Sequence, residues 1–242
     1  MIRKMMVLMA ALFLLSPAIT FAADFCAADN NGDCKVDLTD LVTMKSEFMK
    51  PDCEACSPAY PAPVAKTGQI ECYDETGNPR DCSGTGSDGD LQKGVAWPNP
   101  RFTDNRNGTV MDNLTGLIWL DNANCFDLRT WSQALTDCNG LNDGECVLTD
   151  GSQVGDWRLP NKNELNTLID AAYHTPALSN TEGTGQWTEG NPFTNVQSTF
   201  YWSSTEYAVH GAFAWGLSIS NGLVTYDVKS NYGYVWPVRG PQ

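Results

Sequence analysis

At residues 155–165 the spacing of hydrophobic residues changes from the two-residue period of a strand to the period of a helix, and we call this segment the corner. Trp157 and Leu159 alternate with polar residues, a pattern that predicts a short half-buried strand. Pro160 ends this alternation, and Asn161 followed three residues later by Glu164 is a capping box that begins a helix. Beyond it, apolar residues recur at helical spacing as Leu165, Leu168, Ile169 and Ala172. The pattern therefore predicts that a sheet meets a helix here and that these residues form the helix's apolar stripe.

Three further elements are predicted before this corner. Asn107-Gly108 lies between the β-rich runs 101–104 and 109–112, and this dipeptide is the strongest short signal for a hairpin. The apolar run 117–120 predicts a buried strand. The segment 130–141 is predicted to be a helix with Thr130 as N-cap, since its apolar residues share one face: Trp131, Ala134, Leu135 and Cys138.

The end of the chain predicts a series of strands. The series begins at Tyr201-Trp202-Ser203-Ser204, continues through 212–219 and 223–228, and closes with 232–239. In the second of these strands, large residues (Phe213, Trp215, Leu217 and Ile219) alternate with small ones (Ala212, Ala214, Gly216 and Ser218). We expect the large residues to face the core and the small ones to form an open face. The expected core tryptophans are Trp119, Trp157, Trp202 and Trp215.

Residues 1–22 are predicted to be a signal peptide. Arg3 and Lys4 precede the apolar run 5–15, and Thr20-Phe21-Ala22 offers small residues for cleavage. No later stretch reaches the roughly 20 apolar residues that a membrane helix needs. We therefore expect an exported protein, in the periplasm, at the cell surface or secreted, whose mature chain has no membrane span.

Composition and charge narrow the classes of partner. The chain has a formal net charge of −14, which disfavours nucleic acid and anionic lipid and favours neutral, cationic or calcium-bridged partners. Eight tryptophans, 21 glycines and only 18% charged residues are typical of a loop-rich, strand-leaning exported protein. We expect a small unit at 23–56, a proline-rich spacer at 57–66 and one main domain at 67–242.

The segment 29–40 carries oxygen side chains at the spacing of a calcium-binding loop. The expected ligands are Asp29, Asn31, Asp33, Lys35 through its backbone carbonyl, Asp37 and Asp40. An amphipathic helix is predicted after the loop. The stretch resembles a single dockerin-type calcium loop, although Cys34 stands where glycine is usual and no second copy follows. The alternative is an acidic turn that holds no ion.

Nine cysteines in an exported chain predict disulfides with one thiol left over. Cys72 and Cys82 flank a turn-rich segment, so we expect them to staple a hairpin. Cys138 falls on the buried face of the 130–141 helix, which leaves Cys125 to pair with Cys146. A catalytic thiol at Cys138 is the alternative, and no activating group lies near it in the sequence. Two more disulfides are expected in the N-terminal unit, with the pairing left open among Cys26, Cys34, Cys53 and Cys56; a zinc site at Cys53 and Cys56 is the weaker alternative.

The sequence lacks the usual catalytic motifs, and we assign no catalytic residue. It has no nucleophile elbow, no zinc-protease helix motif and no glycine-rich dinucleotide turn. Ser203-Ser204 near His210, and the many carboxylates, keep a hydrolase as an alternative. Aromatic and amide groups are dense towards the C-terminus, which is the composition of recognition surfaces. The expected ligand-binding residues are Trp187, Tyr207, His210, Tyr226, Asn231, Tyr232 and Tyr234.

An ordered set of motifs carries a family resemblance. They are Phe102-Thr103-Asp104-Asn105, Asn107-Gly108-Thr109-Val110, Asp112-Asn113-Leu114-Thr115-Gly116-Leu117-Ile118-Trp119, Gly155-Asp156-Trp157-Arg158-Leu159-Pro160, Glu164-Leu165, Tyr201-Trp202-Ser203-Ser204 and Trp236-Pro237-Val238-Arg239. From about Thr67 to Arg239 the chain resembles the C-terminal domain family of the Legionella collagen-like adhesin. The corner at 158–160 is also similar to the C-type lectin-like and formylglycine-generating-enzyme fold. This resemblance implies an α+β, C-type lectin-like domain with two helices beside a twisted, mostly antiparallel sheet.

We therefore expect an exported, calcium-loaded, non-enzymatic recognition module stapled by disulfides, with a small helical calcium-loop unit at its N-terminus. It is expected to act as an adhesin-like binder of glycans or of cell-surface or extracellular proteins through its late loops. The adhesin binds sulfated glycosaminoglycans, but the negative charge of this chain opposes such a ligand. The alternatives are an extracytoplasmic hydrolase that uses carboxylates on glycans, and a scaffold docked by its calcium unit. Association into a homo-oligomer is compatible with the sequence.

Overall fold

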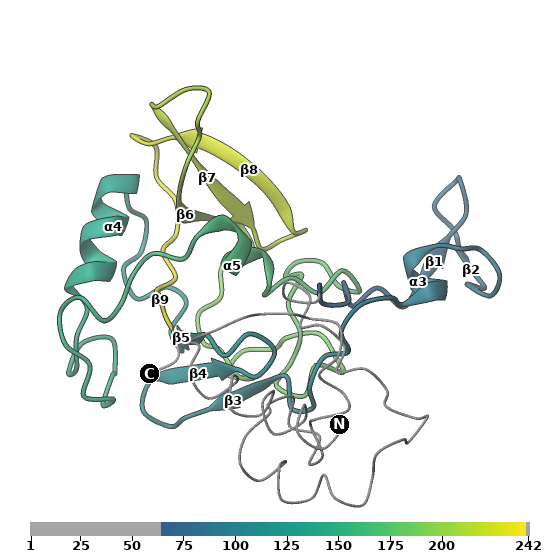
Figure 1. Ribbon diagram of the computed structural model, residues 1–242, viewed down its shortest axis with the longest axis horizontal. Helices are drawn as coiled ribbons and strands as arrows, with labels where there is room; N and C mark the ends of the chain where they lie inside the picture. Colours follow the sequence, from purple (N-terminus) through teal and green to yellow (C-terminus); the bar gives the residue numbers. More distant parts are fainter. Residues whose placement is uncertain (1–63, 241–242) are drawn as a thin grey trace, which may run out of the picture. The chain divides into compact units, whose positions relative to one another are not determined.

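The computed structural model describes residues 64–240, and the chain from Val64 onward forms one compact unit. The expected signal peptide, the calcium loop 29–40 and the four cysteines of the N-terminal unit lie outside the described residues. Within the described chain the fold is mixed, with more sheet than helix, and every pair of named strands is antiparallel (Figure 1).

A four-stranded sheet with the order β3-β4-β5-β9 joins the two ends of the domain. The predicted hairpin is confirmed: β3 (Phe102–Asp104) pairs with β4 (Thr109–Asp112), and Gly108 in the turn has a φ of +82°. The predicted buried strand is also confirmed as β5 (Ile118–Leu120), which pairs with the closing strand β9 (Val238–Arg239).

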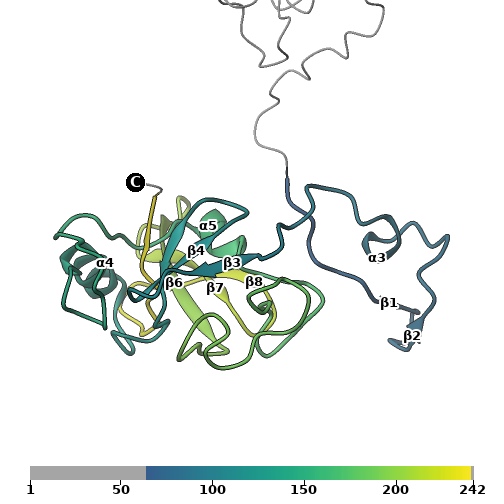
Figure 2. The ribbon, with the colours of Figure 1, turned by 90° about the horizontal axis from the view of Figure 1, so that it is seen from below.

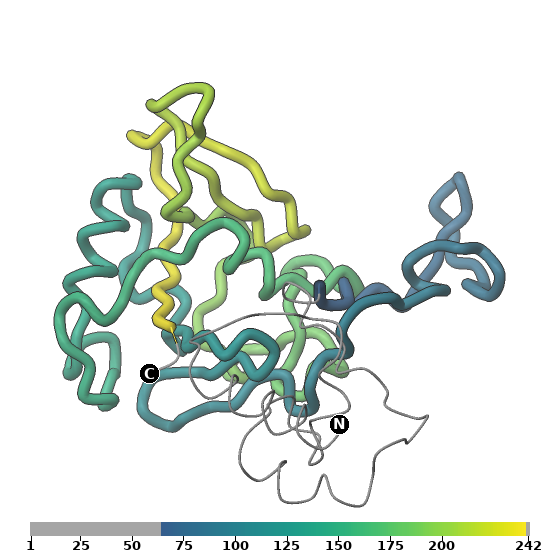
Figure 3. The backbone as a smooth tube through the Cα atoms, viewed as in Figure 1, coloured from purple at the N-terminus to yellow at the C-terminus, as the bar shows by residue number. Residues whose placement is uncertain are grey.

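A second, three-stranded sheet has the order β6-β7-β8. Its strands are β6 (Phe200–Glu206), β7 (Phe213–Ser218) and β8 (Leu223–Val228), joined by short turns. Before β6 the chain makes a long excursion from Thr167 to Thr199 without a named helix or strand, whose path Figure 3 follows. This sheet places late aromatic residues side by side, with Trp215 directly opposite Tyr226.

Two helices lie against this sheet, and both begin where the sequence predicted. Helix α4 (Trp131–Gly140) starts after Thr130, whose backbone N–H donates to the Gln133 side chain at 3.0 Å. It contacts β6, whereas α5 (Lys162–Asn166) contacts β6 and β7. Asn161 accepts from two backbone N–H groups of α5, and Glu164 accepts from the Asn161 backbone, so the capping box is confirmed.

The predicted length of the second helix was wrong. Helix α5 ends at Asn166, before most of the expected apolar stripe. The chain leaves the helical path because later backbone groups find other partners: the Asp170 N–H donates to the Ala177 carbonyl, and the Ala171 N–H donates to Thr67. Leu168 is still buried in the core, from the turn that follows α5. The strand predicted before the corner is reduced to one bridge, in which Arg158 pairs with Val238.

An arm formed by the first described residues extends from this body (Figure 2). It holds the two-stranded ribbon of β1 (Cys72–Tyr73) and β2 (Pro79–Arg80), followed by the short helix α3 (Asp88–Leu91). The expected Cys72–Cys82 disulfide closes the ribbon. At the base of the arm, residues 64–66 run beside Val95 through two backbone hydrogen bonds of 3.0 Å each.

The main core lies between the two sheets and is rich in aromatic rings. Trp119, Trp157, Trp202 and Trp236 are fully buried, which confirms three of the four expected core tryptophans. The Cys125–Cys146 disulfide is present and Cys138 is reduced and buried, as predicted.

The prediction for the two faces of β7 was wrong in part. The small residues do not form an open face: Ala214 is fully buried in a cluster with Cys138 and Trp202, and the α-carbon of Gly216 lies so close to the Phe200 ring that a Cβ would collide with it. Ala134 and Cys138 of α4 belong to the same buried cluster as Ala214. The face of large residues divides, because Leu217 is in the main core whereas Phe213 and Trp215 are half-exposed. The predicted core position of Trp215 was therefore wrong.

Candidate functional site

Five aromatic side chains gather on the outer part of the three-stranded sheet, and we call them the aromatic surface. Its members are Tyr207, His210, Phe213, Trp215 and Tyr226. Phe213 and Trp215 extend from β7, Tyr226 extends from β8, and the other two lie in the turn after β6. All five are half-exposed or exposed, with Tyr226 at 44%.

The rings of the aromatic surface hold one another in place. Tyr207 and Tyr226 are stacked with centroids 4.3 Å apart and only 7° between their planes. Trp215 meets both tyrosines edge to face, at 5.3 Å from Tyr207 and 5.5 Å from Tyr226. The ring centroids of Phe213 and His210 lie 5.0 Å apart. Such offset and edge-to-face pairs each contribute about 0.5–1.5 kcal/mol beyond the area they bury, so the cluster is preorganised.

Backbone hydrogen bonds fix the turn that carries Tyr207 and His210. The Tyr207 N–H donates to the Phe213 carbonyl at 3.1 Å. The His210 N–H donates to the Tyr207 carbonyl and the Phe213 N–H to the His210 carbonyl, each at 3.0 Å. These hydrogen bonds order the backbone of the turn before any ligand binds, which lowers the entropic cost of binding.

Lysine side chains border the aromatic surface. Lys162, the first residue of α5, places its Nζ 5.4 Å from the Trp215 ring centroid, within the range of a cation–π contact. Lys229 pairs with Glu206 at 2.6 Å, and its Nζ lies 4.2 Å from the Trp131 ring centroid. Lys162 therefore places one positive charge beside the aromatic surface, while the charge of Lys229 is paired with that of Glu206.

The structure brings together three of the seven expected ligand-binding residues: Tyr207, His210 and Tyr226. Trp187 and Tyr234 instead pack against the main core, and the Trp187 indole donates to the Phe193 carbonyl at 3.1 Å. Asn231 and Tyr232 lie after β8; Asn231 donates to Asp227 at 2.8 Å. Tyr232 is 66% exposed, and in the described chain its ring contacts none of the five.

Sequence reasoning missed Phe213 and Trp215. From their alternation with Ala214 and Gly216 we expected the large residues to face the core, but alternation alone does not establish which face of a strand is buried. The available signal was the small size of Ala134 and Cys138 on α4, which share a buried cluster with Ala214. That signal depends on knowing which helix and strand meet.

Two of the groups that favoured catalytic alternatives, Cys138 and Ser203, are buried, and Ser203 is hydrogen-bonded. Burial, with a smaller effect of the neighbouring Asp137 charge, raises the pKa of the Cys138 thiol, which opposes formation of a reactive thiolate. The Ser203 hydroxyl donates to the Trp215 carbonyl at 2.7 Å. Across residues 64–240, no group of three or more His, Cys, Asp or Glu side chains is arranged to hold a metal ion. None of the helices in that range has the length and apolar character needed to cross a membrane.

Comparison with known proteins gives a family. No curated protein matches the chain. The family model described as "Lcl C-terminal domain" matches residues 108–239, more than half of the chain. The matched range contains the aromatic surface and both helices of the body but not the arm. This chain belongs to the Lcl C-terminal domain family.

Proposed function

We propose that this protein is an exported, non-enzymatic recognition module, adhesin-like in function, that binds a glycan or a cell-surface or extracellular protein. The aromatic surface is the proposed contact region. The observation that carries this proposal is the set of five half-exposed or exposed rings that contact one another on the sheet and its adjoining turn. Rigid aromatic side chains supply large contact area at low entropic cost, and the apolar face of a sugar ring or a protein side chain packs well on them.

Charge favours a neutral ligand over a sulfated one. The net charge of −14 opposes the approach of polyanions, and the basic groups at the aromatic surface are few. Lys162 lies over the Trp215 ring, while Lys229 is paired with Glu206. We therefore propose a neutral or weakly charged glycan as the first ligand to test, with a protein surface as the second.

Three further features of the proposal have separate support. The C-type lectin-like fold is supported by two helices packed against an antiparallel sheet and by a closing strand that pairs inside the domain. The calcium loop 29–40 is supported by its ligand spacing alone. Export is supported by the predicted signal peptide and by two disulfides, which persist in oxidising compartments. Calorimetric titration of the exported chain and of its D33A variant with calcium tests the loop. Equal heats of calcium binding for the two proteins would contradict calcium binding there.

The experiment for the main proposal is a glycan array probed with the oxidised, exported chain in calcium. Selective binding to one sugar class is expected, and Y226A should weaken it at least tenfold because the stacked ring is lost. The matched control is Y73A, since Tyr73 is a similarly exposed tyrosine, 52%, on the distant ribbon of the arm. Equal loss in both variants, or none in Y226A, would contradict a site at the aromatic surface.

The same array separates the alternatives. Turnover of a bound glycan would favour the hydrolase that uses carboxylates. An array without signal would shift the proposal to protein partners, with the 23–66 segment as the next bait for the scaffold hypothesis.

A further inference from the structure

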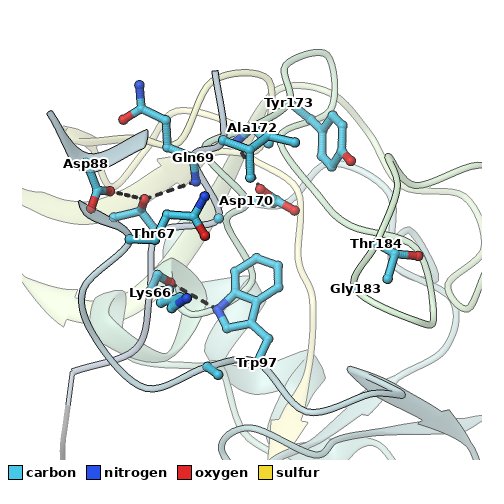
Figure 4. Close-up of a pocket in the computed structure, with 14 residues that line it drawn as sticks. Lys66, Thr67, Gln69, Asp88, Trp97, Asp170, Ala172, Tyr173, Gly183 and Thr184 are labelled. Atoms are coloured by element: carbon cyan, nitrogen blue, oxygen red, sulfur yellow. Dashed lines mark hydrogen bonds between the residues drawn. The ribbon is translucent and has the colours of Figure 1, made fainter. Parts of the chain in front are cut away.

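A pocket of 220 Å³ lies where the arm meets the body, away from the residues of the aromatic surface. The arm contributes residues 66–70 and Trp97, and the body contributes residues from the turn after α5 and from the loop at 183–184. Figure 4 shows Trp97 and Tyr173 on two sides of the space, with Asp170 between them. Because the family match begins at residue 108, one wall of this pocket lies outside the matched region.

Asp170 is the buried charged group of this pocket. Its residue is only 3% exposed, and its Oδ1 accepts a hydrogen bond from the Ala172 backbone N–H at 2.9 Å. Gly68, at a φ of +88°, packs so closely that a Cβ there would collide with the same oxygen. Within residues 64–240, the second carboxylate oxygen has no hydrogen-bond partner and no basic side chain lies within ion-pair distance of Asp170.

Arg101 is close enough to influence Asp170 without forming an ion pair with it, and its buried Nη1 has no hydrogen-bond partner among residues 64–240. Its guanidinium donates to Asp112 through Nε and Nη2, and Nη2 also donates to the Thr167 carbonyl at 2.9 Å. Burial raises the pKa of Asp170, and it outweighs the lowering by the Ala172 hydrogen bond and the Arg101 charge. A buried carboxylate that lacks a contacting cation is costly, so a cationic ligand group would relieve that cost.

The walls suit a cation that carries an apolar chain. The Trp97 indole N–H donates to the Lys66 carbonyl at 3.0 Å, the Arg101 guanidinium carbon lies 4.7 Å from the ring centroid, and the ring lines the pocket. Tyr173 supplies a second ring. The charged residues of the lining also include the acidic Asp88 and the basic Lys66. Aromatic rings around a carboxylate attract ammonium groups through both charge and cation–π interaction.

We propose that this pocket binds a primary ammonium group on a short apolar chain, as found in a lysine side chain or an alkylamine. The ammonium contacts the open oxygen of Asp170, and the chain packs between Trp97 and Tyr173. A neutral sugar would leave the buried charge without a counter-ion, which is why the amine is the favoured class. This site is independent of the aromatic surface and of the ligand proposed for it.

The test is a titration of the full exported chain with n-butylammonium chloride, followed through the indole N–H signals in ¹⁵N-labelled protein. The Trp97 indole N–H signal, identified by its absence from the spectrum of W97F, should shift saturably with butylammonium. Neither 1-butanol nor methyl glucoside at equal concentration should cause this shift. D170N, which keeps an acceptor for Ala172, should weaken binding at least tenfold. D156N is the matched control because Asp156 is exposed and lies outside the pocket lining; it should bind like the parent.

Several results would overturn the proposal. An equal shift with 1-butanol would show a purely apolar pocket, and saturation by methyl glucoside alone would show a sugar site. Unchanged affinity in D170N would remove Asp170 as the anchor. If D170N does not fold, Y173L keeps the carboxylate and removes one ring, and it should weaken butylammonium binding about threefold; unchanged affinity there would equally refute the site.

Discussion

Replacement of Asp112 by alanine should destabilise the described unit far more than loss of a surface charge does. The Arg101 and Asp112 side chains are both fully buried, and Arg101 donates to the two carboxylate oxygens at 3.1 and 2.9 Å. Asp112 also accepts from the Leu114 backbone N–H and from the Thr115 hydroxyl, each at 2.8 Å. D112A therefore leaves a charged guanidinium inside the protein without its hydrogen-bonded anion.

The size of the effect follows from what each variant leaves behind. Removing one partner of a buried ion pair costs about 3–5 kcal/mol, and D112A should lie near the upper end because two further donors lose their acceptor. R101M should cost less, since Asp112 keeps Leu114 and Thr115 as donors. In the double variant neither member of the ion pair is left without the other, so its cost should fall below the sum of the single costs by about 2–3 kcal/mol.

Urea unfolding of the full chain, followed by tryptophan fluorescence, measures these free energies. The first tryptophan in the sequence is Trp97, so the signal comes from the described unit. The control is E206Q, which breaks the exposed pair with Lys229 and should cost no more than about 1 kcal/mol, as Glu206 is 60% exposed. A D112A cost close to that of E206Q, or additive single costs, would refute the claim that burial makes this pair important.

Two further predictions concern packing and pH. G216A should cost about 1–3 kcal/mol because the new methyl collides with the Phe200 ring, whereas G211A, with open space around it, should lie within about 0.5 kcal/mol of the parent in the same urea assay. Burial tends to raise the pKa of Glu164, but its hydrogen bonds from Arg158 and from a backbone N–H, with the Arg158 charge, lower it overall. The stabilisation is therefore complete above the ordinary value of 4.5 and is lost as the pH falls through the lowered pKa. E164Q should cost about 0.5–1 kcal/mol at pH 7 and less at about pH 3, and a cost independent of pH would contradict this account.

Local signals in the sequence were sufficient for much of the fold. The Asn107-Gly108 turn and the capping box at Asn161 act over three or four residues, so no tertiary information is needed to recognise them. Cys138 was placed correctly because helical periodicity alone puts it on a buried face, and that placement determined the Cys125–Cys146 pairing.

The candidate sites depended on contacts that the sequence does not display. Ala214 of β7 is buried in one cluster with Ala134 and Cys138 of α4, whereas Trp215 on the other face of the strand stays half-exposed. Beyond the end of α5, the Ala171 backbone N–H donates to the Thr67 carbonyl of the arm and so does not continue the helix. Nothing in the sequence around Asp170 indicated that this residue is buried, because its burial arises where two segments about 100 residues apart in sequence meet.

Arg101 couples the stability of the body to the shape of the pocket. Its guanidinium carbon lies 4.7 Å from the Trp97 ring centroid, and its Nη2 reaches the carbonyl of Thr167 just after α5. One buried cation thus connects the β3–β4 hairpin, the end of α5 and the aromatic wall that holds the proposed amine. D112A should therefore weaken both folding and butylammonium binding, because it frees the group that supports Trp97. D170N should weaken binding far more than folding, since an amide still accepts the Ala172 hydrogen bond. A D112A protein that is destabilised but binds the amine normally would show that Trp97 is held by the arm rather than by Arg101.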